Sequence, residues 1–171
     1  MKIPAKKVCA IGVLTAVSLG LFVVEAALPP FPLFPYIKIG LANIVTLMMF
    51  YGGFRPAECL IALLLRIILG ALIIGQPMTV IFSGAGGLAA FLVMWALRKP
   101  FPLKYAPITS VFAALAHNAG QICVAVGVYG SFSVLYYLPF IILGGIGGGL
   151  VTGFAVKLIF RLQPRLFKIS K

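Results

Sequence analysis

The residues of this sequence with the clearest capacity for chemistry are polar side chains that interrupt long apolar runs. Arg66 lies within a run of Leu and Ile. A charged side chain near the centre of a bilayer costs about 2.5 to 3.5 kcal/mol, so it needs a partner or an aqueous cavity. His117, Asn118 and Gln121 form a second polar group, in which spacings of three and four place Gln121 beside both others on a helix surface. A guanidinium together with amide and imidazole groups can bind an anion or a polar head group.

Three further polar residues lie near the ends of apolar runs, at a depth compatible with that of Arg66. They are Glu25, Lys38 and Asn43. Two cations against one carboxylate favour an anionic or zwitterionic ligand, bound in a pocket open to the outside. The expected substrate-binding residues are Glu25, Lys38, Asn43, Arg66, His117, Asn118 and Gln121.

Interhelical hydrogen bonding is an alternative role for the histidine and the amides of this set. Such contacts hold helices together in a membrane and are worth about 0.6 kcal/mol each. Several ionisable groups at one depth are harder to explain in this way, because charges inside a membrane are usually functional. The pattern therefore favours a ligand pocket.

The elements that must position these residues are membrane-spanning helices. The chain has 171 residues, of which 63% are hydrophobic and 9% charged, and its mean hydropathy is +1.18. Soluble domains average roughly 45–50% apolar and 25% charged residues. This composition excludes a soluble enzyme and predicts an all-α, polytopic membrane protein that forms a single integral membrane domain over residues 1–171.

Six apolar segments are separated by glycine, proline and basic residues. The expected transmembrane spans cover about residues 8–28, 37–50, 57–74, 78–97, 106–128 and 134–160. The loop after the first span holds four prolines between Pro29 and Pro35. Prolines cannot continue a helix, so this loop is expected to be stiff and extended.

The basic residues indicate the orientation of these spans. All of the 14 Lys and Arg residues except Lys38 and Arg66 lie at the N-terminus, in alternate loops or at the C-terminal end. The positive-inside rule then places both termini in the cytoplasm, with six spans. The six Tyr and Trp95 fall at span ends, as in an aromatic belt. Basic residues from Lys157 onward share one helix face and are expected to attract anionic membrane lipids.

Other functional classes receive little support from the sequence. The basic residues lie between apolar runs rather than among the polar residues of a soluble fold, so nucleic-acid binding is not expected. Cys9, Cys59 and Cys123 have no CxxC spacing, and no metal site is expected. The glycine-rich stretches lack the G-x-x-x-x-G-K-[ST] pattern of a phosphate-binding loop. The chain is therefore not expected to hydrolyse ATP by itself or to carry a cofactor.

Small residues recur at helical spacing in three spans. Gly12, Ala16 and Gly20 form a stripe on the first span that would allow another helix to approach closely. Glycines between Gly84 and Gly87, and again between Gly144 and Gly153, predict tight helix packing inside the bundle.

Five blocks of sequence, spread over essentially the whole chain, carry a resemblance to a known family. They are KIGLANIVTL from Lys38, LRIILG from Leu65, SGAGG from Ser83, AHNAGQ from Ala116 and YYLP from Tyr136. These blocks resemble the Gx transporter family, whose members are also catalogued as heptaprenyl diphosphate synthase component I. That family is similar to the substrate-binding S components of energy-coupling factor transporters.

The resemblance implies a small six-helix protein of the bacterial cell membrane that binds a small-molecule substrate from outside. A transmembrane coupling protein and two ATPase subunits would drive its release inside. The stripe of Gly12, Ala16 and Gly20 would contact the coupling protein, although it does not match the usual Ala-x-x-x-Ala motif. The segment from Pro29 to Pro35 would be a lid over the pocket.

The name heptaprenyl diphosphate synthase component I suggests a second hypothesis. A prenyl diphosphate synthase needs clustered aspartates to hold the magnesium ions that bridge to the diphosphate. The only acidic residues here are Glu25 and Glu58, expected at opposite membrane faces, so the chain is not expected to be an enzyme. An accessory membrane subunit for the synthesis of a heptaprenyl or menaquinone side chain remains the alternative, followed by a stand-alone carrier. The sequence does not choose between an apolar molecule with an anionic head and a vitamin-like acid.

Overall fold

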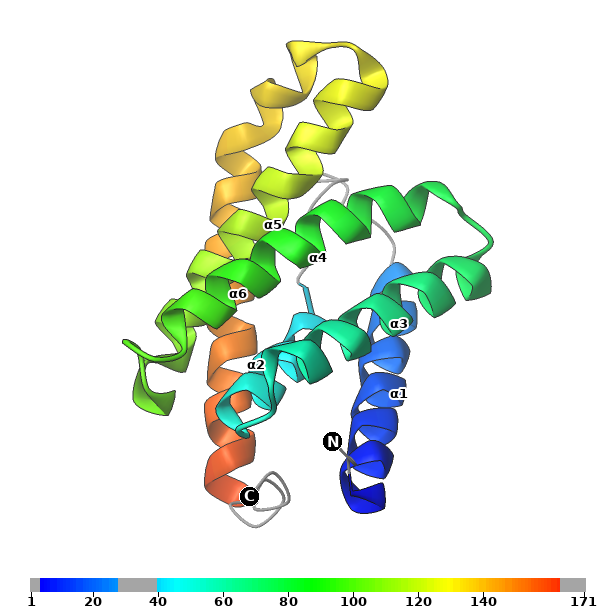
Figure 1. Cartoon of the computed structure of the whole chain (residues 1–171). Coiled ribbons are helices and arrows are strands. Elements are labelled where there is room, and N and C mark those ends of the chain that lie inside the picture. Colours follow the sequence, from blue (N-terminus) through cyan, green and yellow to red (C-terminus); the bar gives the residue numbers. More distant parts are fainter. Residues whose placement is uncertain (1–3, 28–39, 164–171) are drawn as a thin grey trace.

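The structure is a computed structural model that describes residues 4–27 and 40–163, and these residues fold into helices (Figure 1). The helices in chain order are α1 (Ala5–Ala27), α2 (Asn43–Tyr51), α3 (Pro56–Ile74), α4 (Met78–Leu97), the short 3-10 helix η1 (Leu103–Tyr105), α5 (Ala106–Tyr129), the 3-10 helix η2 (Phe132–Tyr137) and α6 (Leu138–Leu162). The all-α class predicted from the sequence is confirmed in this part of the chain.

Proline and glycine set the helix boundaries where the sequence placed them. Pro56 occupies the first turn of α3, where its missing N–H would have no partner in any case. Gly75, with φ of +72°, ends α3, and Gly130, with φ of +60°, ends α5. Glycine adopts this left-handed conformation without the steric penalty of a side chain. The predicted turns after the third and fifth spans therefore have a local cause.

Five helical stretches are long and apolar enough to cross a membrane within the described residues. They contain α1, α3, α4, η1 with α5, and η2 with α6. The predicted second span, residues 37–50, differs from these. Its described part is α2, whose nine residues extend only about 13 Å at 1.5 Å per residue, well short of a hydrocarbon core about 30 Å thick. Residues 37–39 lie outside the described part of the chain.

The short helix α2 lies inside the bundle, in contact with α1, α3, α4 and α6. Seven of its nine residues are buried, and Met49 is completely inaccessible. Around α2, the other helices lie side by side, with α3 beside α1 and α4, and α5 beside α4 and α6. The N-terminal end of α1 and the C-terminal end of α6 lie at the same end of the molecule, at the bottom of Figure 1.

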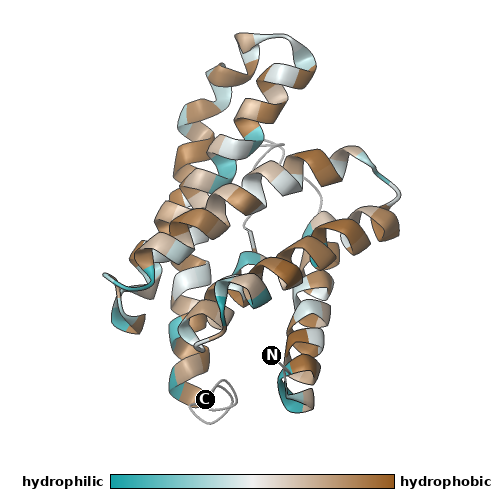
Figure 2. Cartoon of the chain, viewed as in Figure 1, coloured by the Kyte–Doolittle hydropathy of each residue, from teal (hydrophilic) through white to brown (hydrophobic). Residues whose placement is uncertain are grey.

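The outer surface of the bundle is apolar. Leu72, Leu143 and Phe154 are among many large hydrophobic residues that are more than half exposed, and hydrophobic residues make up much of each long helix in Figure 2. A soluble monomer rarely exposes contiguous apolar surface on this scale. The chain is therefore a membrane protein, and this surface faces lipid.

Glycines allow the closest helix approaches, as their positions in the sequence predict. A Cβ added at Gly149 would lie 2.6 Å from Cα of Val111, and one added at Gly153 would lie 2.3 Å from Cα of Pro107. A Cβ at Gly120 would meet the carbonyl oxygen of Ala85 at 2.7 Å. Helix α5 thus contacts the backbones of both α4 and α6. This close approach is possible because the glycines at the contacts have no side chain.

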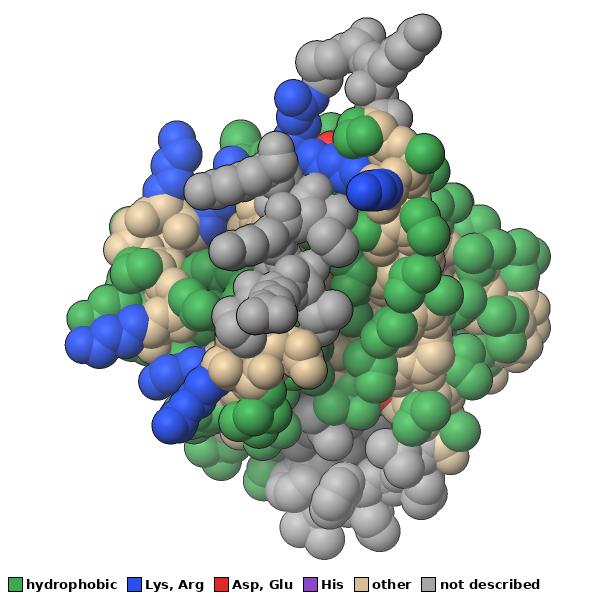
Figure 3. Space-filling view, turned by 90° about the horizontal axis from the view of Figure 1, so that it is seen from below, with side chains coloured by type: hydrophobic (Ala, Val, Ile, Leu, Met, Phe, Trp, Pro, Cys, Tyr) green, Lys and Arg blue, Asp and Glu red, His purple; other side chains and the backbone are tan. Residues whose placement is uncertain are grey.

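Lys and Arg side chains gather at the end of the molecule that carries the start of α1 and the end of α6 (Figure 3). One of them, Lys7, forms an ion pair with Glu58 at 2.9 Å, and both side chains are largely buried. The second carboxylate oxygen of Glu58 accepts the backbone N–H of Arg55 at 2.8 Å. The spacing of three residues between Arg55 and Glu58 predicts a surface pair. Glu58 is instead buried and links α3 to α1.

Candidate functional site

A small polar cavity surrounds Arg66 in the interior of the bundle. It is lined by Phe22, Glu25, Gly40, Ala42, Asn43, Arg66, Ser83, His117 and Gln121. These residues come from α1, from α2 and the residues just before it, and from α3, α4 and α5. The cavity has a volume of about 20 Å³, which is close to the space that one water molecule needs.

Arg66 is the charged centre of this cavity. Only 3% of the residue is exposed, and its guanidinium carbon lies 5.8 Å from the centroid of the Phe22 ring. Glu25 is close enough to attract the guanidinium electrostatically. The buried Nε of Arg66 has no hydrogen-bond partner among the described residues. An N–H group buried without a partner costs roughly 1–3 kcal/mol, and more when it is charged, so an acceptor in the cavity would be stabilised.

Glu25 joins two segments at the edge of the cavity. It lies near the end of α1 and is half-buried, and its Oε1 accepts the backbone N–H of Gly40 at 2.5 Å. Gly40 has a φ of +75°, a left-handed conformation that favours glycine. Asn43 begins α2 three residues later and is 8% exposed. The hydrogen bond therefore holds the entry to α2 against α1 and brings Asn43 to the cavity.

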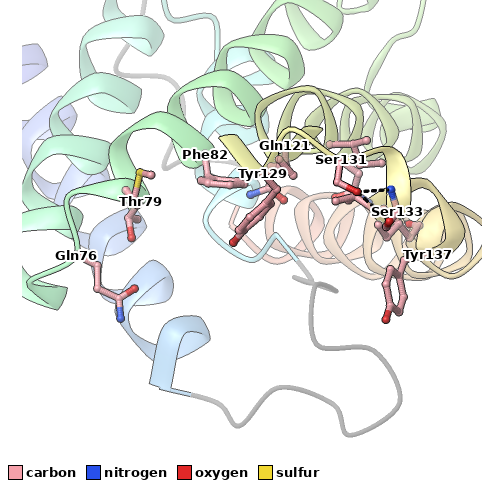
Figure 4. A pocket seen from close by; sticks show the side chains of 14 residues that line it. Gln76, Thr79, Phe82, Gln121, Tyr129, Ser131, Ser133 and Tyr137 are labelled. Carbon is pink, nitrogen blue, oxygen red and sulfur yellow. Dashed lines mark hydrogen bonds between the residues drawn. The ribbon is translucent and has the colours of Figure 1, made fainter. Parts of the chain in front are cut away.

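A larger pocket lies next to this cavity, between α4, α5, η2 and the start of α6 (Figure 4). It has a volume of about 560 Å³, within the usual range for small-molecule sites. Its lining is Gln76, Met78, Thr79, Phe82, Asn118, Gln121, Ile122, Ala125, Tyr129, Ser131, Ser133, Val134, Tyr137 and Ile141. Gln121 belongs to both linings, so the pocket and the cavity meet at this side chain.

The structure brings together five of the residues that the sequence predicted as substrate-binding. They are Glu25, Asn43, Arg66, His117 and Gln121, all in the lining of the small cavity. Asn118 lines the larger pocket instead, and its Nδ2 donates a hydrogen bond to the carbonyl of Ile141 at 3.0 Å. Lys38 and the expected lid from Pro29 to Pro35 lie outside the described residues.

Some residues of the site were missed at the level of sequence. Phe22 and Ser83 line the small cavity, and Tyr129 and Tyr137 line the larger pocket. Ser83 and Tyr137 belong to sequence blocks that carry the family resemblance. Membership in these blocks is a signal that could have added both residues to the predicted site. An apolar Phe22 on α1 carries no such signal, because its role depends on how α1 packs against α3.

The small-residue stripe on α1 lies on an exposed face. Gly12, Ala16 and Gly20 are exposed, and a Cβ added at Gly12 or at Gly20 would have no atom within 4 Å. The opposite face of α1 carries the buried residues Thr15 and Ser18. The described helices therefore leave this stripe uncovered.

The fold and the site together define a polytopic helical membrane protein with a polar cavity inside its bundle and a larger, mainly apolar pocket beside that cavity. Residues 14–159 match the family described as heptaprenyl diphosphate synthase component I, and the chain belongs to this family. The description implies a component that works with partner proteins. No curated protein matches the chain, and no solved structure matches it.

The arrangement can bind a ligand by charge and by hydrogen bonds. Arg66 offers a delocalised cation with a fixed set of donors, and the amide of Gln121 offers both a donor and an acceptor at the junction with the larger pocket. Among the described residues, no group of three His, Cys, Asp or Glu side chains is placed to hold a metal ion.

Proposed function

We propose that this chain is the membrane-embedded substrate-binding subunit of an energy-coupling factor type transporter. It captures a small solute from outside the bacterial cell membrane, and partner subunits drive the uptake with ATP. The observation that carries this proposal is the cavity around Arg66. Five separate chain segments supply its lining, and it holds a buried charged side chain with an unpaired N–H group among the described residues. Intramembrane charges of this kind are usually functional.

The topology in the proposal has six crossings with both termini in the cytoplasm. Support comes from the basic residues at the end that carries the start of α1 and the end of α6 (Figure 3), because basic residues favour the cytoplasmic side. With this orientation, the larger pocket near η2 faces the outside.

The proposed partners are a transmembrane coupling protein and two ATPase subunits. The uncovered stripe of Gly12, Ala16 and Gly20 supports a helix partner, because small residues let two helices approach within van der Waals contact. The basic end of the molecule would also attract anionic membrane lipids. In this proposal the chain itself performs no catalysis and binds no nucleic acid.

The family description supports a second candidate function. A protein described as component I of a heptaprenyl diphosphate synthase would be an accessory membrane subunit beside a soluble catalytic partner, in the synthesis of a heptaprenyl or menaquinone side chain. This candidate predicts an association with an aspartate-rich soluble synthase and gives the cavity around Arg66 no role.

Purification of this chain from its native membrane in mild detergent, followed by mass spectrometry of copurifying proteins, tests both candidates. Recovery of a transmembrane protein together with two ATPases is the expected result. Recovery of a soluble prenyl synthase without ATPases would replace the first candidate with the second. Gly12→Leu serves as the matched variant, since the transporter proposal expects it to lose the coupling protein.

A further inference from the structure

We infer that the ligand of this site is an amphiphilic anion, with its charged head against Arg66 and its apolar body in the larger pocket. This inference rests on the proposed substrate-binding function and gives it a substrate class. The juxtaposition of a small polar cavity around Arg66 and a large, mainly apolar pocket at Gln121 carries it.

The small cavity selects an anionic head. The Nε of Arg66 lies in the interior without a hydrogen-bond partner in residues 4–27 and 40–163, and the Phe22 ring contacts the guanidinium but accepts no ordinary hydrogen bond from it. Glu25 is also engaged by the N–H of Gly40. An oxygen of a carboxylate or phosphate would accept from Nε in a charge-assisted hydrogen bond, which is about twice as strong as a neutral one.

The larger pocket selects an apolar body. Phe82, Ile122, Ala125, Val134 and Ile141 supply much of its lining, and burial of apolar ligand surface there contributes roughly 25 cal/mol per Å². Its hydroxyl and amide groups belong to Gln76, Thr79, Asn118, Gln121, Ser131 and Ser133, together with the phenols of Tyr129 and Tyr137. A fully hydrophilic solute would leave the apolar part of this surface without a matching partner.

Gln121 is the movable group between the two compartments. It is only partly buried, and its unbranched side chain can adopt several rotamers. The space beside it exists because residue 86 is glycine: a Cβ there would lie 2.9 Å from Cε1 of His117 and 3.0 Å from Cγ of Gln121. The cavity of about 20 Å³ is too small for a carboxylate or phosphate, so the head enters when the Gln121 side chain turns away.

Four radiolabelled probes of known chemistry test this inference on the full chain in lipid nanodiscs: octanoate, octyl phosphate, octan-1-ol and acetate. Binding is measured by scintillation proximity, with empty nanodiscs as the background. The expected result is saturable binding of octanoate, of octyl phosphate or of both, at least tenfold tighter than that of octan-1-ol and of acetate. The phosphate and carboxylate arms identify the head group. The inference would be overturned if neither octanoate nor octyl phosphate bound more tightly than octan-1-ol.

Two variants locate the ligand. Arg66→Gln is expected to remove the preference for the anion over the alcohol, whereas Arg98→Gln, at the far end of α4, leaves the preference unchanged. Thr79→Phe fills part of the larger pocket from a half-exposed position and is expected to weaken octyl binding at least tenfold. If Arg66→Gln does not yield folded protein, the Thr79→Phe variant tests the inference instead. Unchanged octyl binding in Thr79→Phe would contradict the inference.

Mass spectrometry of the small molecules retained by the natively purified chain separates this inference from the proposed function. Retention of an amphiphilic anion by the wild-type protein and its loss from Arg66→Gln would support both. Retention of a hydrophilic solute that depends on Arg66 would leave the transport function standing and overturn the substrate class. If no solute is retained and no probe binds, both fall.

Discussion

The guanidinium of Arg66 on α3 is placed over the ring of Phe22 on α1, with 5.8 Å between the guanidinium carbon and the ring centroid. This arrangement depends on a glycine one turn along α3, since a Cβ at Gly70 would lie 2.5 Å from Cε1 of Phe22. The close approach of α1 to α3 thus positions the one charged side chain of α3 that is buried in the middle of the helix. A cation over an aromatic ring is stabilised by roughly 0.5–2 kcal/mol, which offsets part of the cost of burying Arg66.

Replacement of Arg66 separates a binding role from a structural one. Arg66→Ala is expected to weaken binding of the natively retained solute roughly ten- to 150-fold, because a hydrogen bond to a charged group contributes about 1.5–3 kcal/mol. The protein should remain folded, because the substitution removes the cost of burying a charged side chain. Binding and size-exclusion profiles in detergent measure the two effects. Loss of the folded peak would indicate a structural role instead.

Two glycines of α6 form a matched pair for the packing of α5 against α6. Gly153→Ala is expected to destabilise the protein by about 1–3 kcal/mol, because the new Cβ would meet the backbone of Pro107 at 2.3 Å. Gly147→Ala places its Cβ in open space and removes the conformational freedom of glycine, so it should be neutral or slightly stabilising. Thermal unfolding in detergent compares the two. Equal melting temperatures would show that α5 and α6 do not pack this closely.

The exposed stripe of α1 is expected to be a docking surface. Gly12→Leu or Ala16→Leu should block association with the coupling protein, since a large side chain prevents close helix approach. Ligand binding should survive, because the stripe has open space around Gly12 and faces away from the cavity. Copurification and solute binding are measured on the same preparations. Val13→Leu, at an exposed position beside the stripe, is the control, and unchanged association in Gly12→Leu would remove the docking role.

The proposed orientation can be tested with single cysteines. Each substitution is made separately in a variant without the native cysteines. Lys99→Cys places the new cysteine at an exposed position after α4, and Phe132→Cys places it at an exposed position of η2. A membrane-impermeant maleimide added to intact cells should label Phe132→Cys and leave Lys99→Cys unlabelled until the cells are opened. The reverse labelling pattern would invert the topology, and labelling of both in intact cells would contradict opposite locations.

The sequence by itself determined the class of the protein and the types of residue in its site. Hydropathy and the Gly and Pro breaks predicted helices whose ends largely agree with α1, α3, α4, α5 and α6, because these signals act over a few neighbouring residues. The cost of burying charge identified Arg66 without any knowledge of its surroundings. Glycine spacing likewise predicted close helix contacts.

Tertiary structure alone decided which of these residues meet. The periodicity of a helix predicts which of its own residues lie on the same face. The distance between residues of different helices depends instead on long-range packing. For this reason Asn43, Arg66 and His117 gather at one cavity while Asn118, the neighbour of His117, lines the larger pocket. Packing also decided that α2 is a short buried helix in its described part and that Gln121 stands between the polar cavity and the apolar pocket.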